Sequence, residues 1–230
     1  MSETALIVGT GSGLSASLAR LFAKEGMQVA LAARDPGKIA DLAKETSART
    51  YTCDASRRED AGACIAAVVR DLGVPHIVVY NPSYRVRGPF IELDPVEVEK
   101  TLMVTCYGGF LVGQAAAKLM LERGRGSILF TGASASVKGY ALSAPFAMGK
   151  FGLRGLAQSM ARELAPKNIH VAHFVIDGGI KQQSDPRGGA RGNDGLLEPD
   201  AIAQTYLHIH RQHRSAWTWE VELRPWVETF

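Results

Sequence analysis

The sequence predicts an α/β fold in which a doubly wound, seven-stranded parallel sheet is flanked by helices on both faces. Two observations lead to this prediction. Seven short runs rich in apolar and β-branched residues alternate with six longer segments that are apolar at helical spacing. Most of the short runs lack an alternation of apolar and polar residues, so we expect both faces of these strands to be covered, as in a parallel sheet.

The elements can be placed along the chain in order. We expect strands at residues 4–9, 28–33, 49–54, 76–81, 127–132, 170–177 and 218–224. The expected helices occupy residues 13–25, 37–47, 57–72, 95–122, 146–165 and 199–212. No repeat or low-complexity linker interrupts the pattern, so we expect a single domain over residues 1–230. The polar stretch 182–195, rich in Gly, Pro and Arg, is expected to form a flexible loop beside the substrate.

Composition and charge narrow the functional classes. The 26 Lys and Arg against 23 Asp and Glu give a formal charge of +3, which is too small and dispersed to indicate a nucleic-acid partner. Three scattered cysteines without metal-ligand spacing are typical of reduced intracellular thiols, and no metal is expected. Neither a secretory signal nor an apolar stretch of about 20 residues is evident, so we expect a cytoplasmic protein without a membrane partner.

A glycine-rich turn follows the first expected strand. Residues 9–15 read GTGSGLS and lead directly into a helix. Glycines permit a tight turn and let backbone N–H groups approach a pyrophosphate, which the helix N-terminus also attracts. The position between the first strand and first helix is typical of a Rossmann-type dinucleotide site, although a plain strand-to-helix turn is the alternative. The candidate cofactor-binding residues in this turn are Gly9, Gly11, Ser12, Gly13 and Leu14.

The end of the second expected strand bears on the choice of cofactor. An acidic residue there usually binds the free ribose 2′-hydroxyl of NAD(H), whereas the 2′-phosphate of NADP(H) requires a cation. Ala33 carries no carboxylate, and Arg34 supplies a guanidinium that can form charge-assisted contacts with phosphate. The sequence therefore favours NADP(H) over NAD(H). The alternative is that Arg34 is a solvated turn residue, and the neighbouring Asp35 leaves that alternative open.

These motifs resemble those of the short-chain dehydrogenase/reductase family over nearly the whole chain. The family opens with Thr and Gly, three variable residues, Gly, an aliphatic residue and Gly. This chain has Val8 and Gly9 at the start of that pattern, then Gly13 and Leu14, with Ser15 in place of the final glycine. The segment 149–171 resembles the helix and following strand that carry the family's catalytic lysine.

The resemblance implies further cofactor contacts. Asp54, followed by Ala55, matches the acidic residue after the third strand that contacts adenine in the family. Asn81 is the one match to the family's Asn-Asn-Ala-Gly motif after the fourth strand. Asp177 and Gly178 stand where the family has Pro-Gly. Asp54, Ala55, Asn81, Gly178 and Lys150 therefore join the expected cofactor-binding residues.

The resemblance also shows where the expected catalytic set departs from the family pattern. Family members use Asn, Ser, Tyr and Lys, in which the phenol exchanges a proton, the lysine lowers the phenol's pKa and the serine orients the carbonyl. Here Phe146 stands at the tyrosine position, Thr105 at the asparagine position, and Lys150 is retained. Ser134 is the better match for the serine and Ser136 the weaker one. Loss of a general acid typically costs about 10²–10⁴-fold in rate.

Another group must then supply the proton if the chain is an enzyme. The candidates are Ser134, Tyr84, Tyr107, Tyr140 and Lys150 acting through a water, with Lys150 and Ser134 ranked first. Arginines 85, 87, 187 and 191 lie in loops that leave the carboxyl ends of strands, where an acidic substrate could bind. The alternative is that these arginines are ordinary surface residues.

The leading functional expectation is an NADP(H)-dependent oxidoreductase that acts on a carbonyl or alcohol of an unidentified small molecule through a tyrosine-less site. One alternative is a non-catalytic nucleotide-binding sensor, or the partner subunit of an active paralogue. A lyase or isomerase without net hydride transfer is a third reading. The helices at 95–122 and 146–165 are apolar on more than one face. The resemblance implies that they pair copies of the chain into a homodimer or homotetramer.

Overall fold

The computed structural model describes residues 2–182, 192 and 194–228, so most of the expected loop at 182–195 lies outside the described residues. A seven-stranded sheet in the order β3-β2-β1-β4-β5-β6-β7 forms the centre of the fold, and every neighbouring pair is parallel. Its strands are β1 (Thr4–Val8), β2 (Gln28–Ala33), β3 (Arg49–Thr52), β4 (Ile77–Tyr80), β5 (Gly126–Thr131), β6 (Ile169–Ile176) and β7 (Glu220–Leu223). The predicted parallel sheet is confirmed, with strand ends shifted by at most a few residues.

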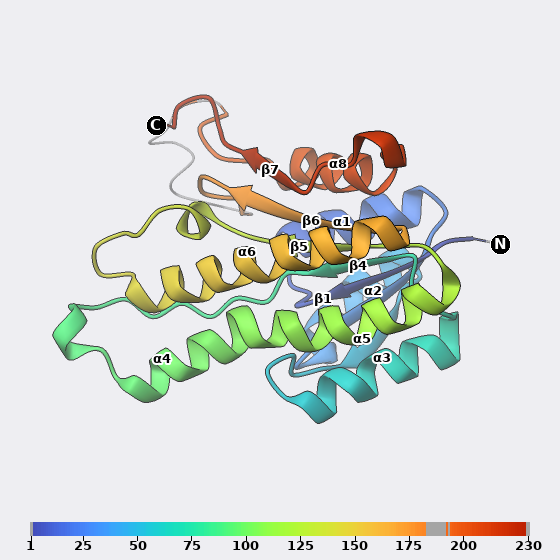
Figure 1. The fold of residues 1–230 in the computed structure, drawn as a ribbon, viewed down its shortest axis with the longest axis horizontal. Helices are drawn as coiled ribbons and strands as arrows, with labels where there is room; N and C mark the ends of the chain where they lie inside the picture. Colours follow the sequence, from blue (N-terminus) through green and yellow to red (C-terminus); the bar gives the residue numbers. More distant parts are fainter. Residues whose placement is uncertain (1, 183–191, 193, 229–230) are drawn as a thin grey trace.

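Helices cover both faces of the sheet, as Figure 1 shows. One face packs against α1 (Leu14–Lys24), α2 (Ala40–Thr46) and α8 (Pro199–His210). The other face packs against α3 (Arg58–Leu72), α5 (Gly108–Arg123) and α6 (Ala144–Leu164). Strands β1, β4 and β6 are buried along their whole length, which is the reason that their sequences are apolar without alternation.

The expected helix 95–122 is a continuous helix with a local change of winding. It begins as α4 (Pro95–Leu102), passes through a π-helical turn (Met103–Tyr107) and continues as α5. Asp94 starts it by accepting a hydrogen bond from the backbone N–H of Val96, and the following proline suits the first turn. Single π-helical turns inside α-helices frequently lie at functional sites.

This continuous helix is unusually apolar. Among the described residues, Pro95–Arg123 is the one helix long and apolar enough to cross a membrane by length and composition, with a mean hydropathy of 1.2 over an 18-residue window. This finding differs from the prediction that the chain has no apolar stretch of about 20 residues. Residues of α5, including Val112, Ala116 and Met120, are buried in the core between the sheet and helices α3 and α6. These contacts account for the apolar composition within the fold.

The sheet brings the loops after its strands to one edge. Because all strands are parallel, the segments after β1, β2, β3, β4, β5 and β6 leave from their carboxyl ends on the same side. The chain runs outward from β1 through β2 to β3, and then returns to place β4 on the other side of β1. Ligands of open α/β sheets bind beside such a reversal of strand order. The site is therefore expected at the loops after β1 and β4.

Candidate cofactor and active site

The turn after β1 is tight at its start and open at its end. Gly9 has a φ of +82°, and a Cβ there would lie 2.6 Å from the backbone nitrogen of Pro82. A Cβ at Gly11 or Gly13 would meet no protein atom within 4 Å. Gly13 precedes α1, and no side chain caps the helix. The open space and uncapped N–H groups fit the pyrophosphate of a dinucleotide.

Ser15 joins the turn to the loop after β4. Its hydroxyl donates to the backbone oxygen of Gly9 at 3.1 Å and accepts from the side-chain amide of Asn81 at 2.7 Å. Asn81 is also anchored by its backbone N–H, which donates to the oxygen of Val8 at 3.0 Å. The sequence alone predicts no more for Ser15 than a small substitute for glycine. The structure shows that it ties together the two loops at the reversal point.

A cavity of about 300 Å³ lies between the loops after β1, β2, β3 and β4. Five of the expected cofactor-binding residues line it: Gly9, Arg34, Asp54, Ala55 and Asn81. The remaining expected residues, Gly11, Ser12, Gly13, Leu14, Lys150 and Gly178, do not line this cavity. The structure thus gathers the adenosine half of the predicted site in one concave space.

The acidic neighbour of Arg34 is engaged elsewhere. The Asp35 carboxylate accepts from the backbone N–H of Gly37 at 3.1 Å and lies 3.8 Å from the ammonium of Lys38. It therefore caps the short 3₁₀ helix Pro36–Ile39 that follows β2. Arg34 is exposed, and within the described part of the chain no carboxylate lies within ion-pair distance of it. Its guanidinium is free to bind an anion at the cavity.

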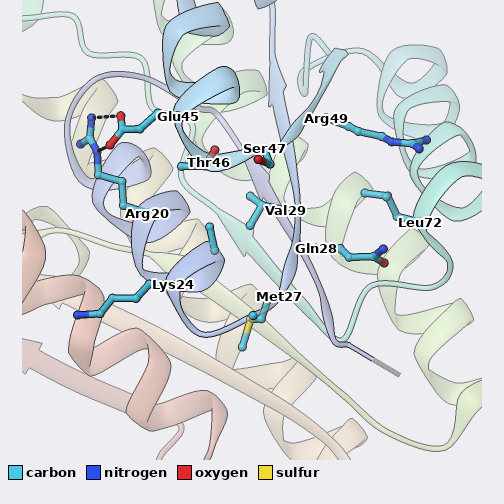
Figure 2. Close-up of a pocket in the computed structure, with 12 residues that line it drawn as sticks. Arg20, Lys24, Met27, Gln28, Val29, Glu45, Thr46, Ser47, Arg49 and Leu72 are labelled. Carbon is cyan, nitrogen blue, oxygen red and sulfur yellow. Dashed lines mark hydrogen bonds and ion pairs between the residues drawn. The ribbon is translucent and has the colours of Figure 1, made fainter.

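A second, larger cavity of about 680 Å³ lies at the opposite edge of the sheet, near the beginnings of β2 and β3 (Figure 2). Gln28 and Arg49 lie beside it, and an ion pair between Arg20 and Glu45 spans 2.7 Å at its rim. None of the expected site residues lines it. Because parallel sheets bind ligands at the carboxyl ends of their strands, this cavity is not the candidate site.

Lys150 lies at the centre of the candidate active site. Only 2% of the residue is exposed, and its ammonium donates to the backbone oxygen of Thr131 at 2.7 Å. No second acceptor is present among the described residues, so two of its three N–H donors remain for a ligand. Burial lowers the pKa of Lys150 to about 8. A buried ammonium with spare donors fits the hydroxyls of a nicotinamide ribose.

Two cations lie close to the ring that replaces the expected tyrosine. The ammonium of Lys150 is 5.8 Å from the ring centroid of Phe146, one helical turn earlier in α6. The guanidinium carbon of Arg85 lies 5.1 Å from the same centroid. Both distances are within the range of a cation–π contact. The sequence placed Arg85 in this loop but gave no sign of its contact with Phe146.

Thr105 is buried in the π-helical turn and faces the loop after β4. Its hydroxyl accepts from the backbone N–H of Tyr84 at 3.3 Å. It also packs against α6, because a Cβ at Gly149 would lie 2.9 Å from the Thr105 Cβ. Thr105, which the sequence predicts at the position of the family's asparagine, thus contacts both the loop and α6.

The two candidate serines differ in their contacts. The hydroxyl of Ser136 is buried and accepts from the backbone N–H of Ala133 at 3.1 Å, which stabilises the 3₁₀ turn Ser134–Ser136. Ser134 is half-buried at the start of that turn, and its side chain makes no hydrogen bond to another described residue. Of the two, Ser134 is the one left free to bind a substrate oxygen.

The three candidate tyrosines differ in their contacts and exposure. The Tyr84 hydroxyl donates to a Glu97 carboxylate oxygen at 2.5 Å and accepts from Lys100 at 3.2 Å, so it is committed to α4. Tyr107 stacks on Phe110, at 6.0 Å between centroids, on an exposed part of the helix. Tyr140 is exposed in the segment before α6.

A buried polar network beneath the site has little sequence signal. His173 on β6 is fully buried, and its Nδ1 lies 3.0 Å from a carboxylate oxygen of Glu220 on β7. Glu220 in turn accepts two hydrogen bonds of 2.7 Å from Arg154 of α6. Burial lowers the pKa of His173 to about 4, so the ring is neutral at pH 7. The only indication in the sequence is that two histidines, His170 and His173, stand within an otherwise apolar strand.

The end of β6 departs from the family pattern in a defined way. Asp177 stands at the proline position, and its carboxylate lies 2.7 Å from Arg224 and 3.4 Å from Lys138. The next residue, Gly178, has a φ of +155°, and a Cβ there would lie 2.7 Å from the Cδ of Pro225. Ion pairs and a close approach to the segment after β7 thus shape this side of the site.

Comparison with known proteins places this geometry in a family. The family model for short chain dehydrogenases matches residues 3–184. A crystal structure of a short-chain dehydrogenase from Rhodopseudomonas palustris is 36% identical, covers 97% of this chain and 99% of its own, and superposes with a TM-score of 0.84. The chain belongs to the short-chain dehydrogenase/reductase family.

Two further matches describe the range of relatives. The crystal structure of a metagenomic short-chain oxidoreductase in complex with NADP is 26% identical, with 98% of each chain covered and a TM-score of 0.84. The cyclic-di-GMP-binding biofilm dispersal mediator protein of Escherichia coli K12 is 30% identical over 81% of this chain and 77% of its own length. Members similar to this chain therefore include both an oxidoreductase and a protein named for binding a nucleotide.

Proposed function

We propose that this protein is an NADP(H)-dependent oxidoreductase that acts on a carbonyl or alcohol group of a small molecule through a site without the usual tyrosine. The observation that carries the proposal is Lys150, a buried ammonium with two spare donors beside Phe146. It lies at the same edge of the sheet as the open turn at Gly11 and Gly13. A buried ammonium with unsatisfied N–H donors destabilises the fold. Its presence therefore indicates that a ligand accepts these hydrogen bonds.

The residues present fit a dinucleotide along this edge. The uncapped start of α1 would bind the pyrophosphate, and the cavity beside Asp54 and Ala55 would take the adenosine. Arg34 would bind the ribose 2′-phosphate, which favours NADP(H) over NAD(H). Lys150 would bind the nicotinamide ribose. The NADP complex of the metagenomic relative supports this assignment. When bound, the cofactor supplies or accepts the hydride.

The protein's own residues then have distinct roles. Ser134 binds the substrate oxygen through its free hydroxyl. Lys150, with a pKa near 8, can exchange a proton with that oxygen through a water near neutral pH. Thr105 acts as a positioning residue because its hydroxyl holds the loop after β4 at Tyr84.

The second candidate is a nucleotide-binding sensor, or a partner subunit of an active paralogue, without catalysis. The specific observation in its favour is Phe146, whose ring has no proton to exchange. The cyclic-di-GMP-binding relative from Escherichia coli supports it as well. This candidate retains the cofactor half of the site and assigns no reaction to Lys150.

Turnover separates the two candidates. Purified protein with NADPH, and separately with NADP⁺, is assayed at the nicotinamide absorbance against broad panels of carbonyls and alcohols. The oxidoreductase predicts a substrate-dependent absorbance change that is lost in Lys150→Met. Nucleotide binding without any turnover would favour the sensor. Product formation at unchanged absorbance would point to a reaction without net hydride transfer.

A further inference from the structure

Arg85 lies directly beside the position where the substrate would bind. Its guanidinium carbon is 5.1 Å from the ring centroid of Phe146, the residue at the usual tyrosine position. The ring provides a flat apolar platform on which a planar guanidinium can stack while its N–H groups point outward. A lysine at this position would lack that planar fork.

The charge of Arg85 is not neutralised by the protein. Within the described residues, no carboxylate lies within ion-pair distance of it. Glu97, which contacts the loop through Tyr84, is already engaged, because its carboxylate accepts from Tyr84 and lies 3.5 Å from the ammonium of Lys100. Lys150 adds a second cation within 5.8 Å of the Phe146 ring. The space around this ring is therefore electropositive.

The loop that carries Arg85 is held at several points. Asn81 is bonded to Ser15, and the backbone N–H of Tyr84, directly before Arg85, donates to Thr105. Further along, the backbone N–H of Gly88 donates to the oxygen of Leu142 at 3.2 Å, next to α6. These bonds hold the loop backbone on both sides of Arg85, whose exposed side chain rests on the Phe146 ring.

We propose that Arg85 binds a carboxylate of the substrate, so that the site takes carbonyl or hydroxy compounds that also carry a carboxylate. The proposal rests on the proposed function, since it names the substrate class of that site. The planar fork of arginine matches the two oxygens of a carboxylate in a bidentate pair. Because Lys150 is assigned to the nicotinamide ribose, Arg85 is the cation that remains for the substrate, and its single charge matches a carboxylate better than the double charge of a phosphate monoester.

Binding, not turnover, tests this assignment. The protein is saturated with NADP⁺, which cannot reduce a ketone, and titrated calorimetrically with pyruvate and 4-oxopentanoate. Their methyl esters are the uncharged probes, and inorganic phosphate is a third probe. We expect at least one carboxylate to bind about 10-fold or more tightly than its ester, as a bidentate charge-assisted pair implies.

Variants assign the effect to Arg85. Arg85→Met keeps an unbranched stem but removes the charge and the guanidinium, and it should abolish the preference for the carboxylate. Arg85→Lys should retain only part of the preference for the carboxylate, because lysine keeps the charge but lacks the planar fork. Arg87→Met is the matched control, because Arg87 is an exposed arginine on the same loop without a contact to the Phe146 ring. It should leave the preference intact.

The outcomes are distinct from those that test the proposed function. Loss of NADP⁺ binding would overturn the proposed function, and titrations without cofactor would then still test Arg85. Intact NADP⁺ binding with equal affinity for acids and esters would overturn the carboxylate assignment. An equal loss in Arg85→Met and Arg87→Met, no binding of either carboxylate, or binding of phosphate alone would overturn it as well.

Discussion

Phe146 is the residue that we propose stands in place of the family's tyrosine. Its ring carries no hydroxyl whose pKa the neighbouring Lys150 could lower. Arg85 lies beside the same ring. None of the proposed cofactor contacts uses a hydroxyl at this position. A substitution at Phe146 should therefore change proton transfer without changing nucleotide binding.

Restoring the phenol should test that separation. Phe146→Tyr places a hydroxyl on the same helix, one turn before Lys150, whose cation favours the ionised phenol. We expect the rate of NADPH oxidation with uncharged carbonyls to rise by about 10²–10⁴-fold over the natural chain. Phe146→Leu is the control and should give no gain. Equal rates in Phe146→Tyr and the natural chain would show that proton transfer from this position does not limit the reaction.

Lys150 has a cost to the fold that can be measured. Its pKa falls from 10.5 to about 8 on burial, so the folded protein binds fewer protons than the unfolded chain between those two pH values. The contribution of Lys150 to the free energy of unfolding thus becomes more favourable as pH increases from 8 to 10.5. Below pH 8 the full cost is present, about 3 kcal/mol by the size of the shift.

Lys150→Met should therefore stabilise the cofactor-free protein. At pH 7 we expect a gain of about 1–3 kcal/mol in the free energy of unfolding, reduced by the lost hydrogen bond to Thr131. The gain should shrink between pH 8 and 10.5. Urea unfolding at a series of pH values measures it. A less stable variant at pH 7 would contradict the assignment of a desolvated cation.

At the scale of elements, α6 brings Lys150 and Phe146 to the site, and its packing against the π-helical turn sets its position. The contact is made at Gly149, where a Cβ would approach within 2.9 Å of the Thr105 Cβ. Gly155, on the same helix, has no atom within 4 Å of an added Cβ. The two glycines thus occupy opposite packing environments in one helix.

Alanine at these two positions should have opposite effects. Gly149→Ala gains helix propensity, but its methyl group would be overpacked against Thr105. We therefore expect the free energy of unfolding to fall by about 1–3 kcal/mol and catalysis to weaken. Gly155→Ala should stabilise the protein by about 0.5–1 kcal/mol, because it gains helix propensity alone. Thermal and urea unfolding compare them. Stabilisation by both substitutions would mean that α6 is not tightly packed against Thr105.

The elements also show what the sequence could predict. Apolar runs and glycine punctuation locate the strands, because their signals are local and repeat along the chain. The candidate residues after β1, β2, β3 and β4 follow from those strand ends. By contrast, the bond between Ser15 and Asn81, the pair of His173 and Glu220, and the stacking of Arg85 on Phe146 all join residues far apart in sequence. No local pattern encodes such contacts.

At the scale of the whole molecule, two helices present apolar side chains to solvent. Tyr107 and Phe110 are 39% exposed on and beside α5, and Met148 and Phe151 on α6 are 51% and 44% exposed. Apolar residues exposed on neighbouring helices are typical of interaction surfaces. We therefore keep the proposal that copies of the chain associate through these helices.

Light scattering tests this association. A chain of 24.7 kDa should give the mass of a dimer or a tetramer at micromolar concentration. Phe110→Glu combined with Phe151→Glu should shift the mass toward the monomer, because two charges would be buried on pairing. A monomeric natural chain would contradict the proposal.

Across the carboxyl edge of the whole sheet, a pyridine dinucleotide would extend from the start of α1 to Lys150. Calorimetric titration of the purified protein with NADPH and with NADH tests it most directly. We predict binding of NADPH, weaker binding of NADH, and about a 10-fold or greater loss of NADPH affinity in Arg34→Ala through the lost charge-assisted contact. Absence of measurable binding by either nucleotide would contradict the claim.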